Sequence, residues 1–340
     1  MTFPNVKFIG NKRVLSIQSS VSHGYVGNRS ATFPLQLHEW EVDVVPTVHF
    51  SNHLGYGATR GSACIPEEVH DLLNALLQDN GIVYDAILTG FVPNHDIIQV
   101  IFDCVLAYKK DHPKVLWLLD PVMGDQGKMY VDTNVISTYK AMIPHAFAIT
   151  PNAFEVEILT DIVIHTQMDA KRGLEKIYQL YGIQNAIITS FEVEESPGTL
   201  FCMGYSCEHG KPQLFLYQFP SLSGVFTGTG DLFSGLLLAK YREELDKRKH
   251  QQSDETKQTK RPTVLACAVG QVLSCMHTVL VNTKTYADEI LLEDPKIASD
   301  EFLLSNAREL RLIQSRTALL SKKSIYEAEF LPGFEEGEDV

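Results

Sequence analysis

The sequence predicts an α/β protein in which a doubly wound, mainly parallel sheet carries helices on both faces. Three observations predict this class. Short β-rich runs alternate with segments of helical period through the first half of the chain, as in crossover units. The 340 residues are 44% hydrophobic, enough to bury a large core. Beyond residue 190, two β runs punctuated by glycine and proline predict a small antiparallel extension.

The expected elements follow from these patterns in chain order. Apolar and β-branched runs predict parallel strands at 13–18, 41–48, 84–89, 115–119, 146–150 and 186–189. Helical periodicity predicts helices at 31–38, 66–77, 97–108, 153–159 and 170–181. The antiparallel strands are expected at 198–205 and 213–219, and a further helix begins at Asp231.

We expect one domain over residues 12–320. Residues 1–11 form an N-terminal extension, and an acidic tail runs from 321 to 340. The polar tract 246–261 cannot pack a core, so it is expected to be a mobile surface insertion.

The longest apolar stretch, Val264 to Val281, is interrupted by Gln271, Ser274 and His277. These polar residues favour a buried helix over a membrane span.

Charge and cysteine usage restrict the possible partners. The net charge of -13 argues against nucleic acid or an anionic membrane as the main partner, because an acidic chain repels both. The N-terminus has no basic start followed by an apolar run, so no secretory signal is expected. Six cysteines without regular spacing are typical of reduced thiols. We therefore expect a protein of the cytoplasm or the nucleus.

The segment Phe226 to Asp231 is the most informative motif. Its Gly-Thr-Gly sequence lets backbone amides converge at the start of a helix, and Asp231 adds a carboxylate at the same point. Such a motif can hold an anion beside a general base. A tight turn with an Asp that complements the helix dipole is the alternative. Neither a G-x-x-x-x-G-K-[ST] phosphate loop nor a G-x-G-x-x-G motif occurs.

Several predicted strands end in polar or small residues. In an open α/β sheet the ligand crevice lies beyond the carboxyl ends of the strands, so these residues are expected to line one cleft. They are Ser19, Thr89-Gly90, Asp120-Pro121, Thr150-Pro151-Asn152 and Thr189-Ser190.

Carboxylates near this edge predict a cation site. Asp125 and Glu155 come from neighbouring loops, and Mg²⁺ prefers one or two carboxylates together with water and phosphate oxygens. In this interpretation Thr150 caps the following helix, and Glu155 lies in its first turns. The alternative is that Asp120 caps a turn and that Asp125 is solvated.

Aromatic and polar side chains near the first two strands suit a flat polar heteroaromatic substrate. Tyr25, Phe50 and Tyr56 offer ring faces, and His53 lies between the last two. The alternative is that Phe50 belongs to the core and His53 is a satisfied turn residue.

Seven ordered motifs together resemble those of pyridoxal kinases of the ribokinase superfamily. The resemblance runs from about Arg13 to Val281. The motifs are Leu15–Ser19, the Gly-Tyr-Val-Gly-Asn-Arg and Ala-Thr-Phe-Pro-Leu-Gln pieces within Gly24–Gln36, Phe50–His53, Leu88–Gly90, Asp120–Val122, Ile149–Asn152 and Gly228–Phe233.

This resemblance implies ATP-dependent phosphorylation of the 5′-hydroxymethyl group of pyridoxal, pyridoxine or pyridoxamine, with a divalent cation such as Mg²⁺ and a monovalent cation. We expect K⁺ as the monovalent cation, but the sequence does not decide between K⁺ and Na⁺. It implies Asp231 as base, and Gly228, Thr229 and Gly230 as anion hole. The implied vitamer-binding residues are Ser19, Val26, Phe50, His53, Leu54, Phe91 and Asp231. The implied nucleotide-site residues are Asp120, Asn152, Glu155, Thr189, Ser190, Thr227 and Thr229. Asp125 and Glu155 are implied for Mg²⁺, and Asp120, Thr150 and Thr189 for the monovalent cation.

Two residues depart from the family pattern. Leu54 stands where many relatives carry Thr, and Phe91 stands where many carry Tyr. Each lost hydroxyl contact changes vitamer affinity by about 0.5 to 1.5 kcal/mol without removing the chemistry.

Two other functions stay open: a kinase for a hydroxymethylpyrimidine, and a non-catalytic relative that binds nucleotide or vitamer. The resemblance also implies a homodimer, with the early strand and helix region as its contact.

Overall fold

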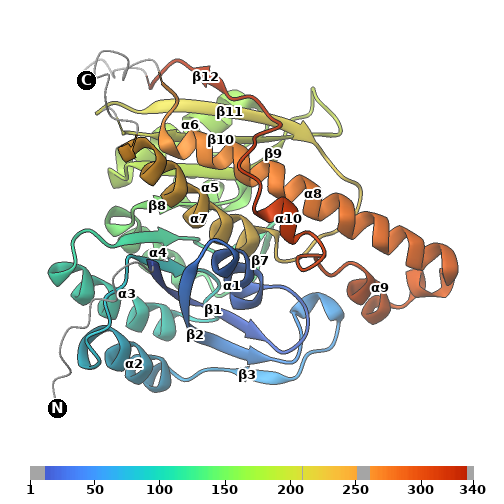
Figure 1. The fold of residues 1–340 in the computed structure, drawn as a ribbon, viewed down its shortest axis with the longest axis horizontal. Helices are drawn as coiled ribbons and strands as arrows, with labels where there is room; N and C mark the ends of the chain where they lie inside the picture. Colours follow the sequence, from blue (N-terminus) through green and yellow to red (C-terminus); the bar gives the residue numbers. More distant parts are fainter. Residues whose placement is uncertain (1–11, 209, 251–260, 335–340) are drawn as a thin grey trace.

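The computed structural model describes residues 12–208, 210–250 and 261–334. Its centre is a ten-stranded sheet in the order β12-β11-β10-β9-β8-β5-β4-β1-β2-β3 (Figure 1). Its strands are β1 (Lys12–Val21), β2 (Trp40–Phe50), β3 (Gly61–Ala63), β4 (Ala86–Thr89), β5 (Leu116–Leu119), β8 (Ala148–Ile149), β9 (Asn185–Glu192), β10 (Thr199–Ser206), β11 (Gln213–Pro220) and β12 (Glu329–Leu331). Strands β6 (Gly124–Asp125) and β7 (Lys128–Met129) form a separate hairpin.

Six neighbouring strands, from β2 through β1, β4, β5 and β8 to β9, pair in parallel. Strands β10, β11 and β12 continue the sheet in antiparallel fashion, and β3 does so at the other edge. The predicted parallel sheet with an antiparallel extension is confirmed. The carboxyl ends of β1, β4, β5, β8 and β9 consequently lie at one edge of the sheet.

Helices cover both faces of the sheet. They are α1 (Gly27–Leu37), α2 (Pro66–Asn74), α3 (His95–Asp111), α4 (Val135–Met142), α5 (Ala153–Thr160), α6 (Gln167–Tyr181), α7 (Thr229–His250), α8 (Val264–Glu293), α9 (Glu301–Ala307) and α10 (Arg316–Leu319). Short helical turns are η1 (Leu54–Tyr56), η2 (Ala75–Asp79), η3 (Ile143–His145) and η5 (Pro295–Ser299).

Alternation along the strands builds two separate cores. Leu15 of β1 packs with α2 to α6 on one face, whereas its neighbour Val14 packs with α1, α7 and α8 on the other. Successive strand residues point to opposite faces, so each strand contributes to both cores. This arrangement is the doubly wound one that the sequence predicts.

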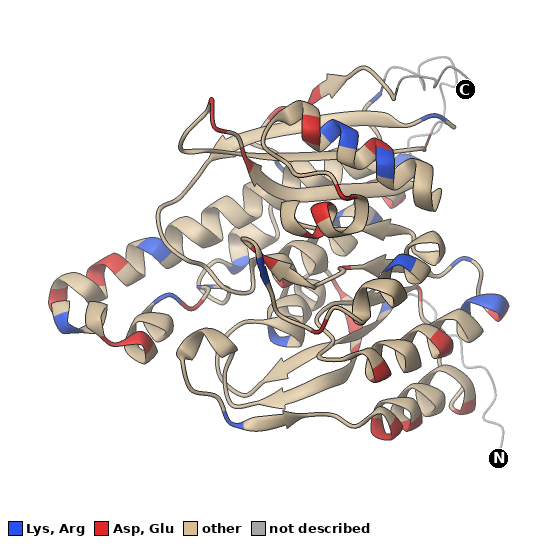
Figure 2. Cartoon of the chain, turned by 180° about the vertical axis from the view of Figure 1, so that it is seen from behind, with Lys and Arg blue, Asp and Glu red and all other residues tan. Residues whose placement is uncertain are grey.

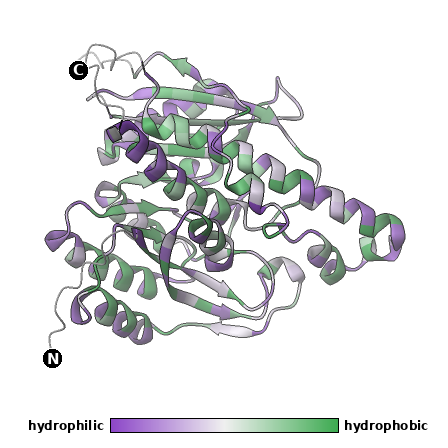
Figure 3. Cartoon of the chain, viewed as in Figure 1, coloured by the Kyte–Doolittle hydropathy of each residue, from purple (hydrophilic) through white to green (hydrophobic). Residues whose placement is uncertain are grey.

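Helix α8 is buried along its first half. By length and composition it could cross a membrane, but 67% of its most apolar window is buried inside the protein, as in the core helix of a globular domain. Figure 3 shows it hydrophobic where it crosses the sheet and more hydrophilic toward its far end. The predicted buried helix is therefore present, and it extends beyond Val281 to Glu293.

Two expected boundaries are wrong. The first residues of the supposed insertion continue helix α7 to His250, and Asp246 bonds Lys12 at 3.0 Å and Arg242 at 3.1 Å. A helix extended from a packed core can carry polar residues that could not nucleate structure alone. Residues 251–260 lie outside the described part of the chain.

The tail is not separate from the domain either. Strand β12 pairs with β11 beyond the expected boundary at residue 320. The N-terminal extension 1–11 and the acidic end 335–340 lie outside the described residues.

Candidate active site

Asp231 lies at the meeting point of two helix N-termini. Its Oδ2 accepts a hydrogen bond from the backbone N–H of Gly27 at 2.7 Å, and Gly27 is the first residue of α1. Asp231 itself lies in the first turn of α7. Burial raises the pKa of Asp231 above its ordinary value, and the Gly27 hydrogen bond partly offsets this. The side chain is only half-buried, so it remains accessible to a ligand.

The Gly228 turn before α7 fixes the amides beside Asp231. Gly228 has a φ of +81°, and a side-chain carbon there would lie 2.0 Å from the carbonyl oxygen of Tyr25. No other residue tolerates both conditions. The first helical bond runs from Leu232 N–H to the carbonyl oxygen of Gly228 at 3.0 Å. The amides of Thr229, Gly230 and Asp231 therefore have no partner within α7 and can meet an anion.

Ser19 and Val26 lie against the same turn. Gly27 has a φ of +51°, and a side-chain carbon on it would lie 2.2 Å from Ser19 Oγ. A carbon on Gly228 would lie 3.3 Å from the Cα of Val26. The structure thus brings Ser19, Val26, Gly228 and Asp231 close together.

A chain of hydroxyl groups links Asp120 to the neighbouring strand end. Ser234 Oγ donates to Asp120 Oδ2 at 2.9 Å, and it lies 3.1 Å from Thr150 Oγ1. Burial and the negative charge of Asp231 raise the pKa of Asp120 to about 7, although the hydroxyl groups of Ser234 and Thr150 counteract the shift. A carbon on Gly230 would lie 3.8 Å from Asp120 Oδ2, which places Asp120 beside the start of α7.

Glu155 is part of a helix cap. Asn152, not Thr150, is the N-cap of α5: its side chain accepts from Glu155 N–H at 2.9 Å. In return, Glu155 accepts from the amides of Asn152 at 2.8 Å and Met123 at 2.9 Å. The expected Thr150 cap is wrong because its hydroxyl is engaged with Ser234.

Burial and the charge of Asp120 raise the pKa of Glu155 well above its ordinary value, against backbone hydrogen bonds that lower it. Glu155 is 2% exposed, so it braces the loop beneath the cleft.

Asp125 lies on the β6–β7 hairpin, and Asn152 is hydrogen-bonded to the same hairpin. Asp125 is exposed on this hairpin, and Asn152 Nδ2 donates to the carbonyl oxygen of Gly124 at 2.7 Å. Both polar groups of Asn152 are therefore used inside the protein. Among residues 12–208, 210–250 and 261–334, no three His, Cys, Asp or Glu side chains gather closely enough to hold a metal ion by themselves. Asp125 can still supply the single exposed carboxylate that a phosphate-bound Mg²⁺ needs.

The remaining predicted residues surround this centre at different depths. Thr189 lies beside the cleft, since its N–H bonds the carbonyl oxygen of Pro151 at 3.0 Å, and Ser190 is the next, half-buried residue. Thr227 is exposed on the turn before α7, and Thr229 is half-buried. Phe50 is half-buried at the end of β2.

The two residues that depart from the family pattern have contrasting environments. Leu54 is 62% exposed on η1. Phe91 packs against the core formed with α2 to α6.

His53 has both of its ring nitrogens bonded inside the protein. Nδ1 accepts from Gly55 N–H at 3.2 Å, and Nε2 lies 3.2 Å from Glu309 Oε1. These contacts agree with the alternative interpretation, in which His53 is a turn residue whose hydrogen bonds are satisfied within the protein. Its loop nevertheless reaches the cleft, because a carbon on Gly55 would lie 3.8 Å from Thr227 Oγ1.

Three residues of the site were not predicted from the sequence: Gly27, Ser234 and Glu309. Ser234 had a visible signal, since it is a hydroxyl one turn after Asp231 within an apolar helix. Gly27 had a weaker one, because α1 has no capping side chain at Val26. Glu309 had none, since its partners are more than 250 residues away along the chain, with separations of 284 to Tyr25 and 253 to Tyr56.

Comparison with known proteins identifies the family of this chain. The family model described as phosphomethylpyrimidine kinase matches residues 42–250. The pyridoxal kinase of Bos taurus is 34% identical over 331 residues, covering 94% of this chain and 98% of the bovine protein. The pyridoxal kinase of Homo sapiens is 32% identical, with 94% and 98% coverage.

Solved structures give the same result. The pyridoxal kinase of Leishmania donovani in complex with ADP and ginkgotoxin is 30% identical, with a TM-score of 0.78 and coverage of 95% of this chain and 100% of that chain. Its complex with ADP and pyridoxamine matches with a TM-score of 0.77 at 29% identity, with the same coverage.

Replacing Asp120 with Asn should change how stability depends on pH in the ligand-free protein. The pKa of Asp120 is about 7 in the fold and about 3.9 in an unfolded chain. The folded state therefore binds an extra proton between these values. Its stabilising effect is complete below about pH 4 and is lost as the pH rises through about 7.

Urea unfolding at about pH 5 and pH 8, without added metal salts, measures this. Between these pH values the parent should lose about 1 to 3 kcal/mol more than Asp120→Asn. Equal losses would contradict the assignment.

Proposed function

This chain belongs to the pyridoxal kinase family, and on that basis we propose that it transfers the terminal phosphoryl group of ATP to the 5′-hydroxymethyl group of pyridoxal, pyridoxine and pyridoxamine. The observation that carries the proposal is the Asp231 carboxylate, held by Gly27 and placed beside the unpartnered amides of the Gly228 turn. The Leishmania donovani complexes with ADP and pyridoxamine support both substrates.

In the proposed reaction, Asp231 acts as general base. Its Oδ2 is fixed by Gly27, which leaves Oδ1 to accept the proton of the vitamer hydroxyl. The hydroxyl oxygen attacks the terminal phosphorus as the bond to the bridging oxygen breaks, and ADP leaves with that electron pair. The amides of Thr229 and Gly230 stabilise the negative charge on the transferred group.

The acidic floor of the cleft supports the proposed cations. Burial raises the pKa of Glu155, Asp120 and Asp231; the charge of Asp231 further raises the pKa of Asp120, and that of Asp120 further raises the pKa of Glu155. When bound, Mg²⁺ would neutralise phosphate charge. We assign it to Asp125, with Glu155 as the brace of its loop, and we assign the monovalent cation, K⁺ by preference, to the neighbourhood of Asp120, Thr150 and Thr189.

The proposed vitamer pocket lies between Ser19, Val26, Phe50 and His53. Leu54 and Phe91 offer no hydroxyl there, so vitamer preference should differ from that of relatives with Thr and Tyr. Asn152, Ser190, Thr227 and Thr229 are proposed to line the nucleotide side.

Charge and cysteines support a small-molecule enzyme of the cytoplasm or nucleus. Along the part of the chain coloured in Figure 2, Lys and Arg positions are interspersed with Asp and Glu positions. All six cysteines are free thiols, as is usual in a reducing compartment.

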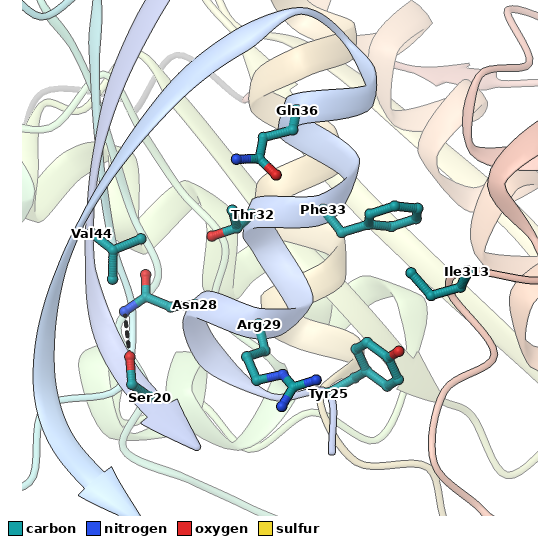
Figure 4. A pocket seen from close by; sticks show the side chains of 9 residues that line it. All are labelled: Ser20, Tyr25, Asn28, Arg29, Thr32, Phe33, Gln36, Val44 and Ile313. Atoms are coloured by element: carbon teal, nitrogen blue, oxygen red, sulfur yellow. Dashed lines mark hydrogen bonds between the residues drawn. The ribbon is translucent and has the colours of Figure 1, made fainter. Parts of the chain in front are cut away.

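A surface groove between α1 and β2 supports the proposed homodimer. The groove has a volume of about 390 Å³ and is lined by Asn28, Thr32, Phe33, Val44 and Ile313 among others (Figure 4). Asn28 Oδ1 and Thr32 Oγ1 are buried without a hydrogen-bond partner. Val44 and Ile313 are 40% and 42% exposed. A second copy would cover Val44, Ile313 and the other side chains that line the groove.

The activity is tested with a panel of alcohols. With ATP and Mg²⁺, a coupled ADP-release assay should show turnover of pyridoxal, pyridoxine and pyridoxamine. Hydroxymethylpyrimidine must be included as the alternative substrate, since the matching family model is described as phosphomethylpyrimidine kinase. Turnover of the pyrimidine alone would overturn the proposal, and so would binding of vitamer and nucleotide without any turnover.

Asp231→Asn should lower kcat/KM for the vitamer by about 10²-fold or more, because Asn can still accept the Gly27 bond but cannot take the proton. Asp246→Asn, at the other end of α7, is the matched control and should leave kcat/KM unchanged. A loss of only a few-fold in Asp231→Asn, with its melting temperature preserved, would remove Asp231 from the role of base.

Val44→Arg should convert the dimer to a monomer, because it adds a second charge, besides that of Arg29, to the surface that the partner would cover. Size-exclusion chromatography with light scattering measures the mass of parent and variant. A monomeric parent, or a variant that stays dimeric, would contradict this interface.

A further inference from the structure

Glu309, which follows helix α9, accepts hydrogen bonds from two loops near the catalytic turn. Its Oε2 accepts from the N–H of Tyr25 at 2.8 Å. Its Oε1 accepts from the hydroxyl of Tyr56 at 2.8 Å and lies 3.2 Å from His53 Nε2. The Glu309 side chain is 12% exposed and that of His53 is 9% exposed, so water does not readily replace these contacts.

The hydrogen bonds identify Glu309 as an ionised acceptor. Gly55 N–H donates to His53 Nδ1, so that nitrogen carries no proton, and Nε2–H must donate to Glu309. Burial alone would raise the pKa of Glu309, but hydrogen bonds from His53, Tyr56 and the Tyr25 amide outweigh it and hold the pKa below its ordinary value. Burial and the Glu309 contact raise the pKa of Tyr56, which keeps its hydroxyl a donor.

Both loops touch the turn that precedes α7. The carbonyl oxygen of Tyr25 lies so close to Gly228 that a side chain there would clash with it. Two residues later along the chain, Gly27 N–H donates a hydrogen bond to Asp231. On the other side, Gly55 lies close to Thr227. A displacement of either loop would therefore move the amides or the carboxylate of the reaction centre.

Helix α9 is itself fixed on the second loop. Ser305 Oγ donates to the carbonyl oxygen of Gly55 at 2.7 Å, and the ring of Phe302 lies 5.0 Å from that of Tyr56. The C-terminal part of the chain thus reaches the cleft through specific contacts.

We infer that Glu309 is a positioning residue for phosphoryl transfer, which holds the 23–27 and 53–56 loops so that Asp231 and the Gly228 turn keep their reactive geometry. This inference rests on the proposed function. Nothing requires Glu309 to touch the vitamer or ATP.

The test compares Glu309→Gln with Glu301→Gln, an exposed residue of α9, in the full-length protein. The amide that Glu309→Gln introduces cannot accept from all three donors, so kcat for the vitamer should fall by about 10- to 100-fold. The KM for ATP should change less than kcat, because Asn152 and Ser190 of the nucleotide side lie on other loops, although Thr227 and Thr229 lie on the Gly228 turn itself. Glu301→Gln should match the parent in both parameters. Tyr56→Phe, which removes one donor of the three, should give a smaller loss in kcat.

Hydrogen–deuterium exchange supplies a readout that does not depend on turnover. In Glu309→Gln the amides of residues 23–28 and 226–231 should exchange faster, whereas those of β4 and β5 should be unchanged. An active parent with a Glu309→Gln variant of unchanged kcat and exchange would overturn the inference. A uniform rise in exchange across the chain would show a merely structural role and would also overturn it. A parent inactive on every vitamer would instead refute the proposed function.

Discussion

The hydrogen bond from Gly27 N–H to Asp231 joins the start of α1 to the first turn of α7 at the proposed reaction centre. It satisfies an amide that α1 leaves free for lack of a capping side chain, and it fixes one oxygen of a carboxylate that starts α7. One interaction thus serves as a helix cap and as the orientation of a base. The two helices pack together in the core shared with α8, so their start points cannot shift independently.

The acidic residues along the cleft floor impose the second constraint. Glu155 is neutralised in part by backbone amides, and Asp120 by hydroxyl groups, but neither is paired with a basic side chain among the described residues. Buried carboxylates of this kind are costly when ionised. The cations that we propose for this site would offset that cost. Burying these carboxylates lowers the stability of the ligand-free protein, and a bound cation would restore it.

Local sequence patterns predicted most of the sheet because period-two alternation and turn residues are short-range signals. They placed the start of α1 at residue 31, whereas the helix begins at Gly27 and contains Pro34, which local propensity disfavours inside a helix. Within the site, the Gly-Thr-Gly-Asp motif was readable because its function lies in contiguous backbone. The cap by Asn152 was missed in favour of Thr150, since both residue types cap helices. The role of Glu309 could not be predicted from the sequence, because it depends on contacts with two loops that lie close to it only in the folded protein.

The great sheet ends on each side in a strand of only three residues, β3 and β12. Long bare borders of a sheet can recruit another chain and lead to aggregation. Here β12 occupies the outer hydrogen-bonding groups of part of apolar β11, and it carries Glu329 and stops just before Pro332. Proline cannot donate to a further ladder, and the glutamate disfavours a neighbour. The C-terminal segment thus covers part of a sheet edge that could otherwise pair with another chain.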